Sequence, residues 1–556
     1  MNKKVCSFPI LFALLALLIG TCAVVFPASA QAAPTSTGSI TVSGTVASSY
    51  DAYQIFSANV VDGDSDAKIA TDLAWASDAV RDAALPMLHS AGMPNSQTTA
   101  QEAAEWLNTD SHLTSALSAQ LARSLQSSGA VSVALNAGTT AELPCGYWLI
   151  VADDDAIAQN EAGTAPIMAL VGGSAVTVKP KAATPKVAKH VLEDSTAAWQ
   201  KAADATVADD LYWRLSATVP AGLTAYDAYT VRFVDTMSAG LDPSKVAASM
   251  RVYVAAGTDG GFDAVSAGRD GRVGTEPAKG WTDITAQCAT KVAADGKTFT
   301  VRTGDLIAAL GGAGAFIAGA RVVAVYNAPL NSACNHGIAK GNPNEVYLRY
   351  PRSPFADQSG DAGFTRTPSD DACAYTWDLA LTKRGSDGDK PLAGAVLSIA
   401  DDRDRTLAAD GTWDAEGKAT VTTGEDGRVT VSGVDSGKLE VRELKAPKGY
   451  TAFEGTRSVT VKAEGLDVDQ VAAAKPKLTV TAESPLRADS ADGSTGSLEA
   501  SLINTPTGTP PSITTGGFMP STGDMAMYAA AAAAVAGAAL IVVALLVKRG
   551  GGSHKE

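Results

Sequence analysis

Histidine and aromatic residues are scarce in this chain of 556 residues, which has five histidines and only 6% Phe, Trp and Tyr. So few histidines leave little material for a metal cluster or for His-based catalysis. Basic residues are outnumbered, 44 Lys and Arg against 59 Asp and Glu, and the net charge of −15 argues against a nucleic-acid partner. The motifs of metalloproteases, serine hydrolases and phosphate-binding loops do not occur. We therefore expect no metal, no cofactor and no turnover enzyme.

Turn-forming residues are abundant, with 52 Gly and 25 Pro. Between them lie short runs that alternate apolar and polar residues, the pattern of half-buried strands. Such runs include Gly38–Val46, Tyr53–Phe56, Val131–Leu135 and Tyr147–Val151. Leu, Ala and Trp recur at helical spacing in Ile69–Leu88 and Thr98–Ser127. The sequence predicts a mostly β protein of tandem immunoglobulin-like β-sandwich domains, the N-terminal one with inserted helices.

Both ends of the chain carry export and membrane signals. Lys3 and Lys4 precede an apolar run and the small residues Ala28–Ala30, the order of a secretory signal peptide. Residues 525–547 are uncharged and mostly apolar, long enough for a transmembrane helix, and a basic tail follows them. We expect a signal peptide at 1–30 and an exported body that is first tethered by its C-terminus.

The sequence just before the C-terminal apolar segment is Met519-Pro520-Ser521-Thr522-Gly523. It resembles the L-P-x-T-G sorting signal of Gram-positive wall proteins, with Met519 where Leu is usual. The resemblance implies that the cysteine of a sortase cleaves after Thr522, holds this residue as a thioester and passes it to an amine. The apolar helix would be removed by this reaction. The alternative is a plain membrane anchor.

Composition and pattern divide the exported body into segments. A Pro/Thr/Gly-rich stretch precedes the sorting motif and is typical of an extended stalk. The third domain has turn signals at the short intervals of a small sandwich. The expected division is an N-terminal domain at 35–180, a middle domain at 185–374, a third domain at 375–504, and a stalk with the sorting motif at 505–523.

The third domain contains Lys383 in its first apolar run, the sequence Glu443-Leu-Lys-Ala-Pro-Lys-Gly-Tyr450, and Asn504 near its end. These residues resemble the collagen-adhesin B-type domain of Gram-positive surface proteins, including its E-box. The resemblance implies an isopeptide bond between Lys383 and Asn504, assisted by Glu443. Burial favours the same chemistry, because it depresses the pKa of an amine and raises that of a carboxyl. The alternative is a buried salt bridge beside an asparagine.

The middle domain repeats this order with Lys189, Asp235 and Asn344. Their surroundings resemble the signatures of the fimbrial isopeptide-forming domain. The resemblance implies a second bond, between Lys189 and Asn344, with Asp235 assisting. Asn342 is a nearby competitor, and we prefer Asn344 because Pro343 separates Asn342 from the alternating run that follows.

Residues Val176–Lys181 resemble the pilin motif V-x-V-Y-P-K, with Lys179 in place of Tyr. In that motif the final lysine, here Lys181, is the amine that accepts the acyl group from sortase. The alternative is a solvated basic linker. Tyr53–Phe56 and Leu143–Trp148 also resemble the first domain of pilus shaft subunits.

Four cysteines follow the predicted signal peptide, and three full pairings are open to them. We predict a disulfide between Cys288 and Cys334; the alternative is unpaired, buried thiols.

Taken together, the resemblances are to a sortase-assembled major pilin of Gram-positive bacteria. They imply a covalent head-to-tail polymer in which Thr522 of one subunit is joined to Lys181 of the next. The implied partners are sortase, identical subunits, tip and basal pilins, peptidoglycan and a host surface ligand. The implied location is the cell wall, after secretion. The alternatives are a monomeric wall-anchored adhesin and a minor or basal pilin. Asp235 and Glu443 would each act once, without turnover.

Overall fold

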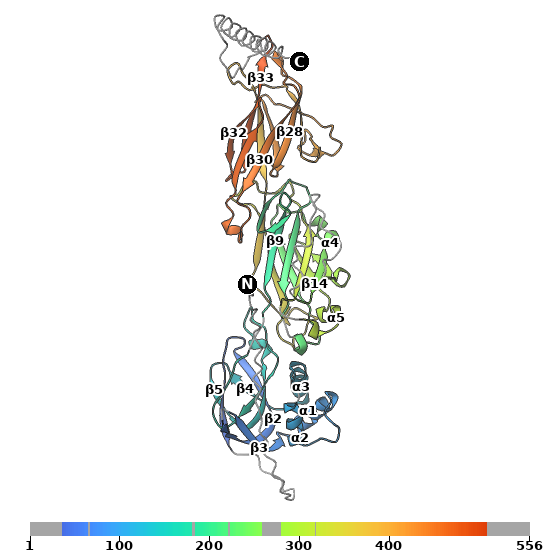
Figure 1. Ribbon diagram of the computed structural model, residues 1–556, viewed down its shortest axis with the longest axis vertical. Helices are drawn as coiled ribbons and strands as arrows, with labels where there is room; N and C mark the ends of the chain where they lie inside the picture. Colours follow the sequence, from blue (N-terminus) through green and yellow to red (C-terminus); the bar gives the residue numbers. More distant parts are fainter. Residues whose placement is uncertain are drawn as a thin grey trace, which may run out of the picture.

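The computed structural model describes residues 36–64, 67–109, 111–180, 184–220, 223–257, 280–316 and 319–508. Their sheets form three modules stacked end to end (Figure 1). The modules run from β1 (Thr37–Val42) to β8 (Val176–Val178), from β9 (Val187–Glu193) to β21 (Asp370–Tyr375), and from β22 (Trp377–Gly385) to β33 (Ser497–Pro506). We name them the N-terminal, middle and C-terminal modules. The mostly β fold predicted from the alternating pattern is confirmed.

The predicted signal peptide at 1–30 and the predicted transmembrane segment at 525–547 lie outside the described residues. Among the residues that the structure does describe, no helix has the length and apolar character needed to cross a membrane.

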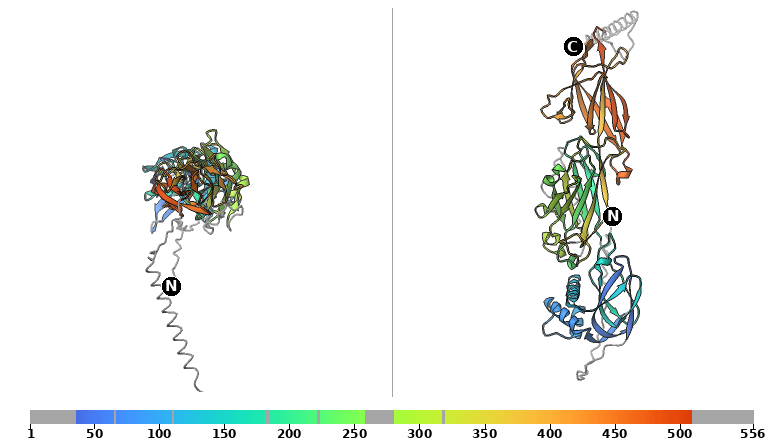
Figure 2. Two further views of the ribbon diagram at one scale, coloured as in Figure 1. Left: turned by 90° about the horizontal axis from the view of Figure 1, so that it is seen from above. Right: turned by 180° about the vertical axis from the view of Figure 1, so that it is seen from behind.

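The N-terminal module combines two sheets with three helices that lie to one side of them (Figure 2). One sheet has the order β5-β1-β8, and the other has the order β3-β2-β6-β7 with β4 paired to β2. The remaining elements are β2 (Ser49–Asp62), β3 (Lys68–Trp75), α1 (Asp78–Ser90), α2 (Ala100–Asn108), α3 (Ser115–Ser128), β4 (Ser132–Asn136), β5 (Thr140–Pro144), β6 (Gly146–Ala152) and β7 (Ile167–Val171).

The inserted helices are confirmed, with two corrections. Residues 69–75 were predicted to be helical but belong to β3, which pairs with β2; the helix begins only after Ser77, whose side chain caps the backbone N–H of Val80. The predicted stretch Thr98–Ser127 is two helices, because the second begins at its own cap, Thr114.

The middle module is a sandwich of two sheets around a buried apolar core. The first sheet has the order β10-β9-β12-β18-β14-β15, and the second has the order β11-β21-β19-β13-β17-β16 with β20 paired to β19. Its other elements are β10 (Ala198–Gln200), β11 (Ala202–Asp204), β12 (Tyr212–Thr218), β13 (Arg232–Met237), α4 (Val246–Ser249), β14 (Arg251–Ala255), β15 (Thr282–Asp283), β16 (Ala289–Val292), β17 (Thr298–Arg302), α5 (Leu306–Ala309), β18 (Arg321–Asn327), β19 (Asn342–Pro351) and β20 (Phe364–Arg366).

The C-terminal module is a second sandwich. One sheet has the order β27-β22-β33-β29 with β32 paired to β33, and the other has the order β25-β24-β23-β28-β30-β31 with β26 paired to β23. The first and last strands of the module, β22 and β33, are therefore parallel neighbours. The others are β23 (Val396–Ala400), β24 (Thr406–Leu407), β25 (Trp413–Asp414), β26 (Val421–Thr422), β27 (Arg428–Val434), β28 (Gly437–Lys445), β29 (Tyr450–Thr451), β30 (Thr456–Glu464), β31 (Lys477–Ala482) and β32 (Leu486–Asp492).

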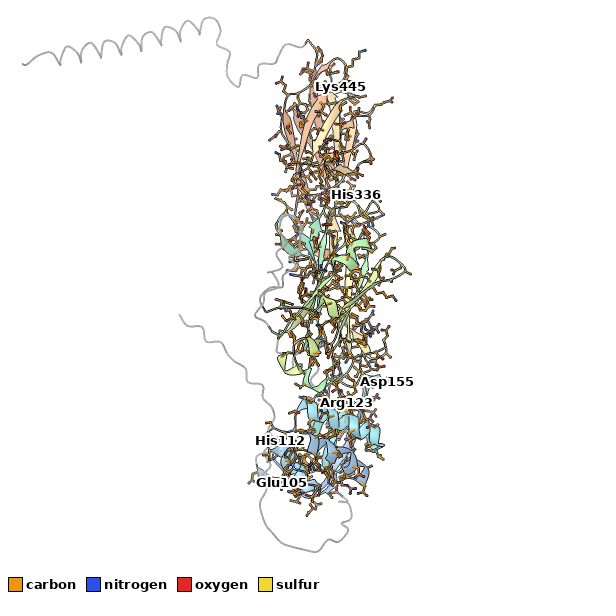
Figure 3. The ribbon with its side chains drawn as sticks, turned by 90° about the vertical axis from the view of Figure 1, so that its right-hand side faces the viewer. Glu105, His112, Arg123, Asp155, His336 and Lys445 are labelled. Carbon is orange, nitrogen blue, oxygen red and sulfur yellow. The ribbon has the colours of Figure 1, made fainter. Side chains whose placement is uncertain are left out.

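Specific polar contacts join neighbouring modules, and Figure 3 labels a residue at each junction. Arg123 of α3 donates to the backbone carbonyls of Ala225 and Pro354, both at 3.1 Å. His336 Nδ1 lies 2.8 Å from Asp378 Oδ1, which links the middle module to the C-terminal one. Because both junctions contain fixed hydrogen bonds, the three modules are joined by more than a flexible linker.

A cluster of carboxyl groups lies at the junction of the middle and C-terminal modules. Glu193 and Asp204 are only 4% and 2% exposed. Burial, and then the charge of Asp204, raises the pKa of Glu193 to about 8. Burial also raises the pKa of Asp194 and, further still, that of Asp435, while Arg403 lies 3.5 Å from Asp194. Within the described residues, no three such side chains are placed to hold a metal ion.

This cluster predicts an unusual dependence of stability on pH. A carboxyl whose pKa is raised by folding binds more protons in the folded state, so stability is lost as the pH rises from the unfolded pKa, about 4.3, toward the folded one. For Glu193 that window ends near the folded pKa of about 8. The loss is about 1.4 kcal/mol per pH unit for each proton released.

Thermal unfolding followed between about pH 5 and pH 8 tests this prediction. We expect a lower melting temperature at the upper end and a smaller slope for Glu193→Gln. Glu440→Gln, on a half-exposed side chain, is the matched control and should keep the wild-type slope. A melting temperature that rises steadily over this range would contradict the prediction.

Candidate functional site

The C-terminal module brings Lys383, Glu443 and Asn504 into direct contact. Lys383 lies in β22 and Asn504 in the parallel neighbour β33, while Glu443 projects from β28 in the opposite sheet. Lys383 Nζ lies 2.5 Å from Asn504 Oδ1 and 2.9 Å from Glu443 Oε1. Asn504 Nδ2 donates to both carboxylate oxygens of Glu443, at 3.0 and 3.1 Å. The amine, the amide and the carboxyl therefore form one closed cluster.

Burial determines the chemistry of this cluster. Lys383 and Asn504 are each 1% exposed, and burial lowers the pKa of the Lys383 amine. The ring of Phe453 lies 5.6 Å from Lys383 Nζ, and the backbone N–H of Phe453 donates to Glu443 Oε2 at 3.0 Å. A lysine in such surroundings has a larger neutral, nucleophilic fraction than one in water, and its Nζ already touches the amide that it would attack.

The middle module brings together Lys189, Asp235 and Asn344, with a fourth residue between them. Lys189 of β9 forms an ion pair with Asp235 of β13. The hydroxyl of Tyr326 in β18 accepts from Lys189 Nζ and from Asn344 Nδ2, both at 2.8 Å, and donates to Asp235 Oδ2 at 3.0 Å. Lys189 and Tyr326 come from one sheet, whereas Asp235 and Asn344 come from the other. The cluster therefore spans the sandwich.

All four side chains of the middle cluster are fully buried. Burial lowers the pKa of Lys189 to about 8 and raises the pKa of Asp235. Asp235 Oδ1 and Asn344 Oδ1 are buried without a hydrogen-bond partner in the structure. Unpaired buried oxygens carry a desolvation cost of about 1–3 kcal/mol each. The middle cluster is thus held less tightly than the C-terminal one, in which the amide oxygen and both carboxylate oxygens have partners.

Parts of the chain are similar to known proteins. Residues 378–475 match the family model of the SpaA prealbumin-like fold domain. The trypsin-resistant surface T6 protein of Streptococcus pyogenes serotype M6 is 30% identical over 143 residues. That match spans about a quarter of each protein, 24% of this chain and 24% of the T6 protein. The chain resembles Gram-positive major pilins.

Solved pilin structures also overlap with this one. The T6 backbone pilin of Streptococcus pyogenes serotype M6 matches 86% of this chain and 100% of its own, with 16% identity and a TM-score of 0.46. The full-length major pilin SpaD from Corynebacterium diphtheriae matches 85% of this chain and 98% of its own, with 15% identity and a TM-score of 0.41.

Tyr326 is the member of the middle cluster that the sequence does not predict. It lies in the strand Arg321–Asn327, in which residues 322–326 are Val, Val, Ala, Val and Tyr and are buried on both faces. Alternation therefore does not indicate which face a side chain takes. The sequence feature that could have indicated Tyr326 is a tyrosine in a valine-rich strand, because a buried tyrosine hydroxyl needs a hydrogen-bond partner.

Asn342 is buried too, so the reason given for preferring Asn344 was wrong. Strand β19 begins at Asn342 itself, and both asparagines point inward. Their environments differ: the Asn342 amide accepts from the backbone N–H of Asn335 at 2.8 Å and donates to its carbonyl at 2.9 Å. The amide of Asn342 is therefore fixed to the backbone, and the asparagine at the lysine cluster is Asn344.

The predicted disulfide between Cys288 and Cys334 is wrong, since both cysteines are free thiols. Cys288 lies just before β16. The first residue of β16 is opposite Arg302 of β17, and Arg302 is in turn opposite Arg232, the first residue of β13. Cys334 packs against Gly240, beyond the other end of β13. That strand separates the two by roughly 20 Å, whereas a disulfide requires Cα atoms within about 7 Å.

The two residues predicted to join subunits, Lys181 and Thr522, lie outside the described residues, as does the whole sorting motif. Lys179, just before Lys181, is exposed and follows β8, the last strand of the N-terminal module. No lysine, aspartate, glutamate or asparagine side chain is buried in the part of that module that the structure describes. The described residues of the N-terminal module therefore include no third lysine cluster.

Proposed function

We propose that this chain is the shaft subunit of a covalently polymerised surface pilus, a structural protein and not a turnover enzyme. The observation that carries the proposal is the contact between Lys383, Asn504 and Glu443 inside a pilin-like module. The end-to-end stacking of three modules, with a second lysine cluster in the middle one, fits a fibre subunit. We propose that each cluster forms an isopeptide bond: a C-terminal bond, Lys383–Asn504, and a middle bond, Lys189–Asn344.

The C-terminal bond would form in three steps. Lys383 transfers a proton from Nζ to Glu443, which leaves a neutral amine and a protonated carboxyl. The Nζ lone pair then attacks the side-chain carbonyl carbon of Asn504. Glu443 gives that proton to Nδ2 and accepts the second proton from Nζ. The C–N bond of the amide then breaks, ammonia departs, and Glu443 is left protonated. Glu443 is in contact with both nitrogens, as a proton shuttle requires.

The middle bond would use Asp235 in the same role, with one added requirement. The Tyr326 hydroxyl bonds both the Lys189 amine and the Asn344 amide, so it holds the two groups near one another. Nζ must exchange its contact with this hydroxyl for the carbonyl carbon of Asn344. We therefore expect the middle bond to form more slowly than the C-terminal bond.

Assembly would follow from the two ends of the subunit. Sortase would cleave after Thr522 and transfer that carbonyl to the Lys181 amine of another subunit. In the sequence, Lys181 falls between β8 and β9, whereas Thr522 comes after β33, the last strand of the C-terminal module. Joining two different surfaces in this way gives an open polymer. The wall location, the tip and basal pilins and a host ligand belong to this proposal.

Denaturing electrophoresis of cell-wall extracts tests the proposed function. A covalent shaft is expected to give a ladder of multimers that survives boiling in detergent and reductant. Digestion of the peptidoglycan with an enzyme such as mutanolysin should release these multimers and leave the bonds between subunits intact. A single band at the monomer mass would overturn the shaft proposal and favour a monomeric wall-anchored adhesin.

A further inference from the structure

The backbone of Lys189 is held by side chains from two other segments. On one edge, β9 pairs with β12, with Lys189 opposite Leu215. On the other edge, β10 pairs with β9 only from Val191 onward, so no strand continues alongside Lys189. There the N–H of Lys189 donates to Asp370 Oδ2 at 2.7 Å, and its carbonyl accepts from Lys201 Nζ at 2.9 Å. Two side chains replace the missing strand neighbour.

Lys201 and Asp370 also bind each other as an ion pair. Lys201 Nζ makes a third bond, to the carbonyl of Asp371 at 3.1 Å, and the residue is only 8% exposed. An ammonium group with three acceptors donates from all its N–H bonds, so it is not a competing nucleophile. We call this arrangement, Lys201 and Asp370 closed around the Lys189 backbone, the clip.

The clip connects the two sheets that carry the reacting groups. Lys201 lies where the chain leaves β10 in one sheet and enters β11 in the other. Asp370 begins β21 and is opposite Val346 of β19, the strand that carries Asn344. The distance between the Lys189 backbone and the Asn344 strand therefore depends directly on the clip.

We propose that Lys201 and Asp370 are positioning residues for the middle bond: the clip fixes the backbone of Lys189 and so aims its amine at the cluster of Asp235, Tyr326 and Asn344. This inference rests on the proposed function, because it presupposes that the middle bond forms. Charge supports the geometry. Burial has the largest effect on the pKa of Lys189 and lowers it. The charges of Asp235 and Asp370 raise this pKa, and the charge of Lys201 lowers it. Loss of the clip would thus change both the position and the protonation of the amine.

The test compares the two bonds within one polypeptide. The full chain is made by cell-free translation, sampled over time and digested with trypsin, and mass spectrometry quantifies the branched peptide of each bond. Each branched peptide weighs about 17 Da less than the sum of its linear parts, because ammonia is lost. The C-terminal bond lies in another module, so its rate of formation serves as the internal reference for the rates of synthesis and folding.

Lys201→Met is expected to slow the middle bond by about tenfold or more, the size of effect that misplacement of a reacting group produces, and to leave the C-terminal bond unchanged. Lys201→Arg keeps the cation and its donors and should restore most of the rate. Asp370→Asn can still accept from the Lys189 N–H but loses the ion pair, so we expect an intermediate rate. Lys245→Met, which removes the more exposed pair with Asp210 in the same module, is the matched control.

Two outcomes separate this inference from the proposed function. If the wild-type chain never forms the middle bond, the middle crosslink itself is wrong and the clip has nothing to position. If the wild-type chain forms the bond and Lys201→Met forms it equally fast, only the positioning role is overturned. Equal slowing by Lys201→Met and Lys201→Arg would also overturn it, because that result indicates general damage to the module.

Discussion

A Lys181→Ala chain is expected to reach the cell wall but to show no ladder of multimers. The reason is chemical: if Lys181 supplies the amine that resolves the acyl-enzyme, its loss leaves only the wall amine to accept Thr522. The expected pattern in cell-wall extracts is a single monomer band in place of the ladder. This effect is the largest that we predict, because we expect polymerisation to be lost completely and not only in part.

Lys179→Ala is the matched control for Lys181→Ala. Lys179 is two residues earlier in the same basic segment, is exposed, and is a plausible competing amine. We expect the Lys179→Ala strain to keep the full ladder. If the ladder instead persists in Lys181→Ala and disappears in Lys179→Ala, the linkage belongs to Lys179. A Thr522→Ala chain, which sortase cannot cleave, should lose both the ladder and the wall-bound monomer, and so distinguishes failed sorting from failed polymerisation.

Force would follow a short path through such a fibre. A force applied at Lys181 would be transmitted to β9, the first strand of the middle module. Lys189 is the third residue of that strand. The middle bond would carry the load across to Asn344 in β19, and the C-terminal bond would carry it from β22 to the end of β33. The N-terminal module precedes Lys181 and lies outside this path. Its described residues include no buried lysine cluster, which agrees with the absence of a load there.

The C-terminal cluster could be predicted from the sequence because its members follow simple alternation. Lys383 occupies the inward position after Leu379 and Leu381, and Glu443 occupies the inward position after Leu439 and Val441. A charged residue in an apolar inward series is buried by the strands around it, whatever its own preference. The resemblance then paired these residues with Asn504, and the structure places all three in contact.

The clip and Tyr326 could not be predicted in this way. Lys201 and Asp370 are 169 residues apart and lie at the ends of short strands, where no periodic pattern extends. Their contact depends on how the chain crosses between two sheets, which is a property of topology and not of local sequence. The disulfide prediction failed for the same reason, since the spacing of Cys288 and Cys334 along the chain contains no information about the two ends of β13.

Glu443→Ala is expected to abolish the C-terminal bond, so that the difference between sequence mass and intact mass becomes smaller by about 17 Da. A wild-type chain of residues 35–508 should weigh about 34 Da less than its sequence, because two molecules of ammonia are lost. The variant should weigh only about 17 Da less than its own sequence, because one molecule of ammonia is lost. Glu443→Gln keeps the shape of the side chain but cannot accept the amine proton, so the same mass change is expected without a cavity. Glu440→Ala, in the same strand and paired with Lys438 near the surface, should retain both bonds.

The stability of these variants should change together with their mass. The C-terminal bond would join residues 121 positions apart, and a crosslink that closes a loop of this size stabilises the folded state by about 5 kcal/mol through restriction of the unfolded chain. Without Glu443 the buried Lys383 also loses its counter-charge, a further cost of about 3–5 kcal/mol. In guanidinium, Glu443→Gln should therefore unfold the C-terminal module at a much lower concentration, while Glu440→Ala unfolds near the wild-type midpoint. A wild-type mass equal to the sequence mass would contradict both bonds and reduce the clusters to buried ion pairs, whose replacement by apolar residues would then cost little or nothing.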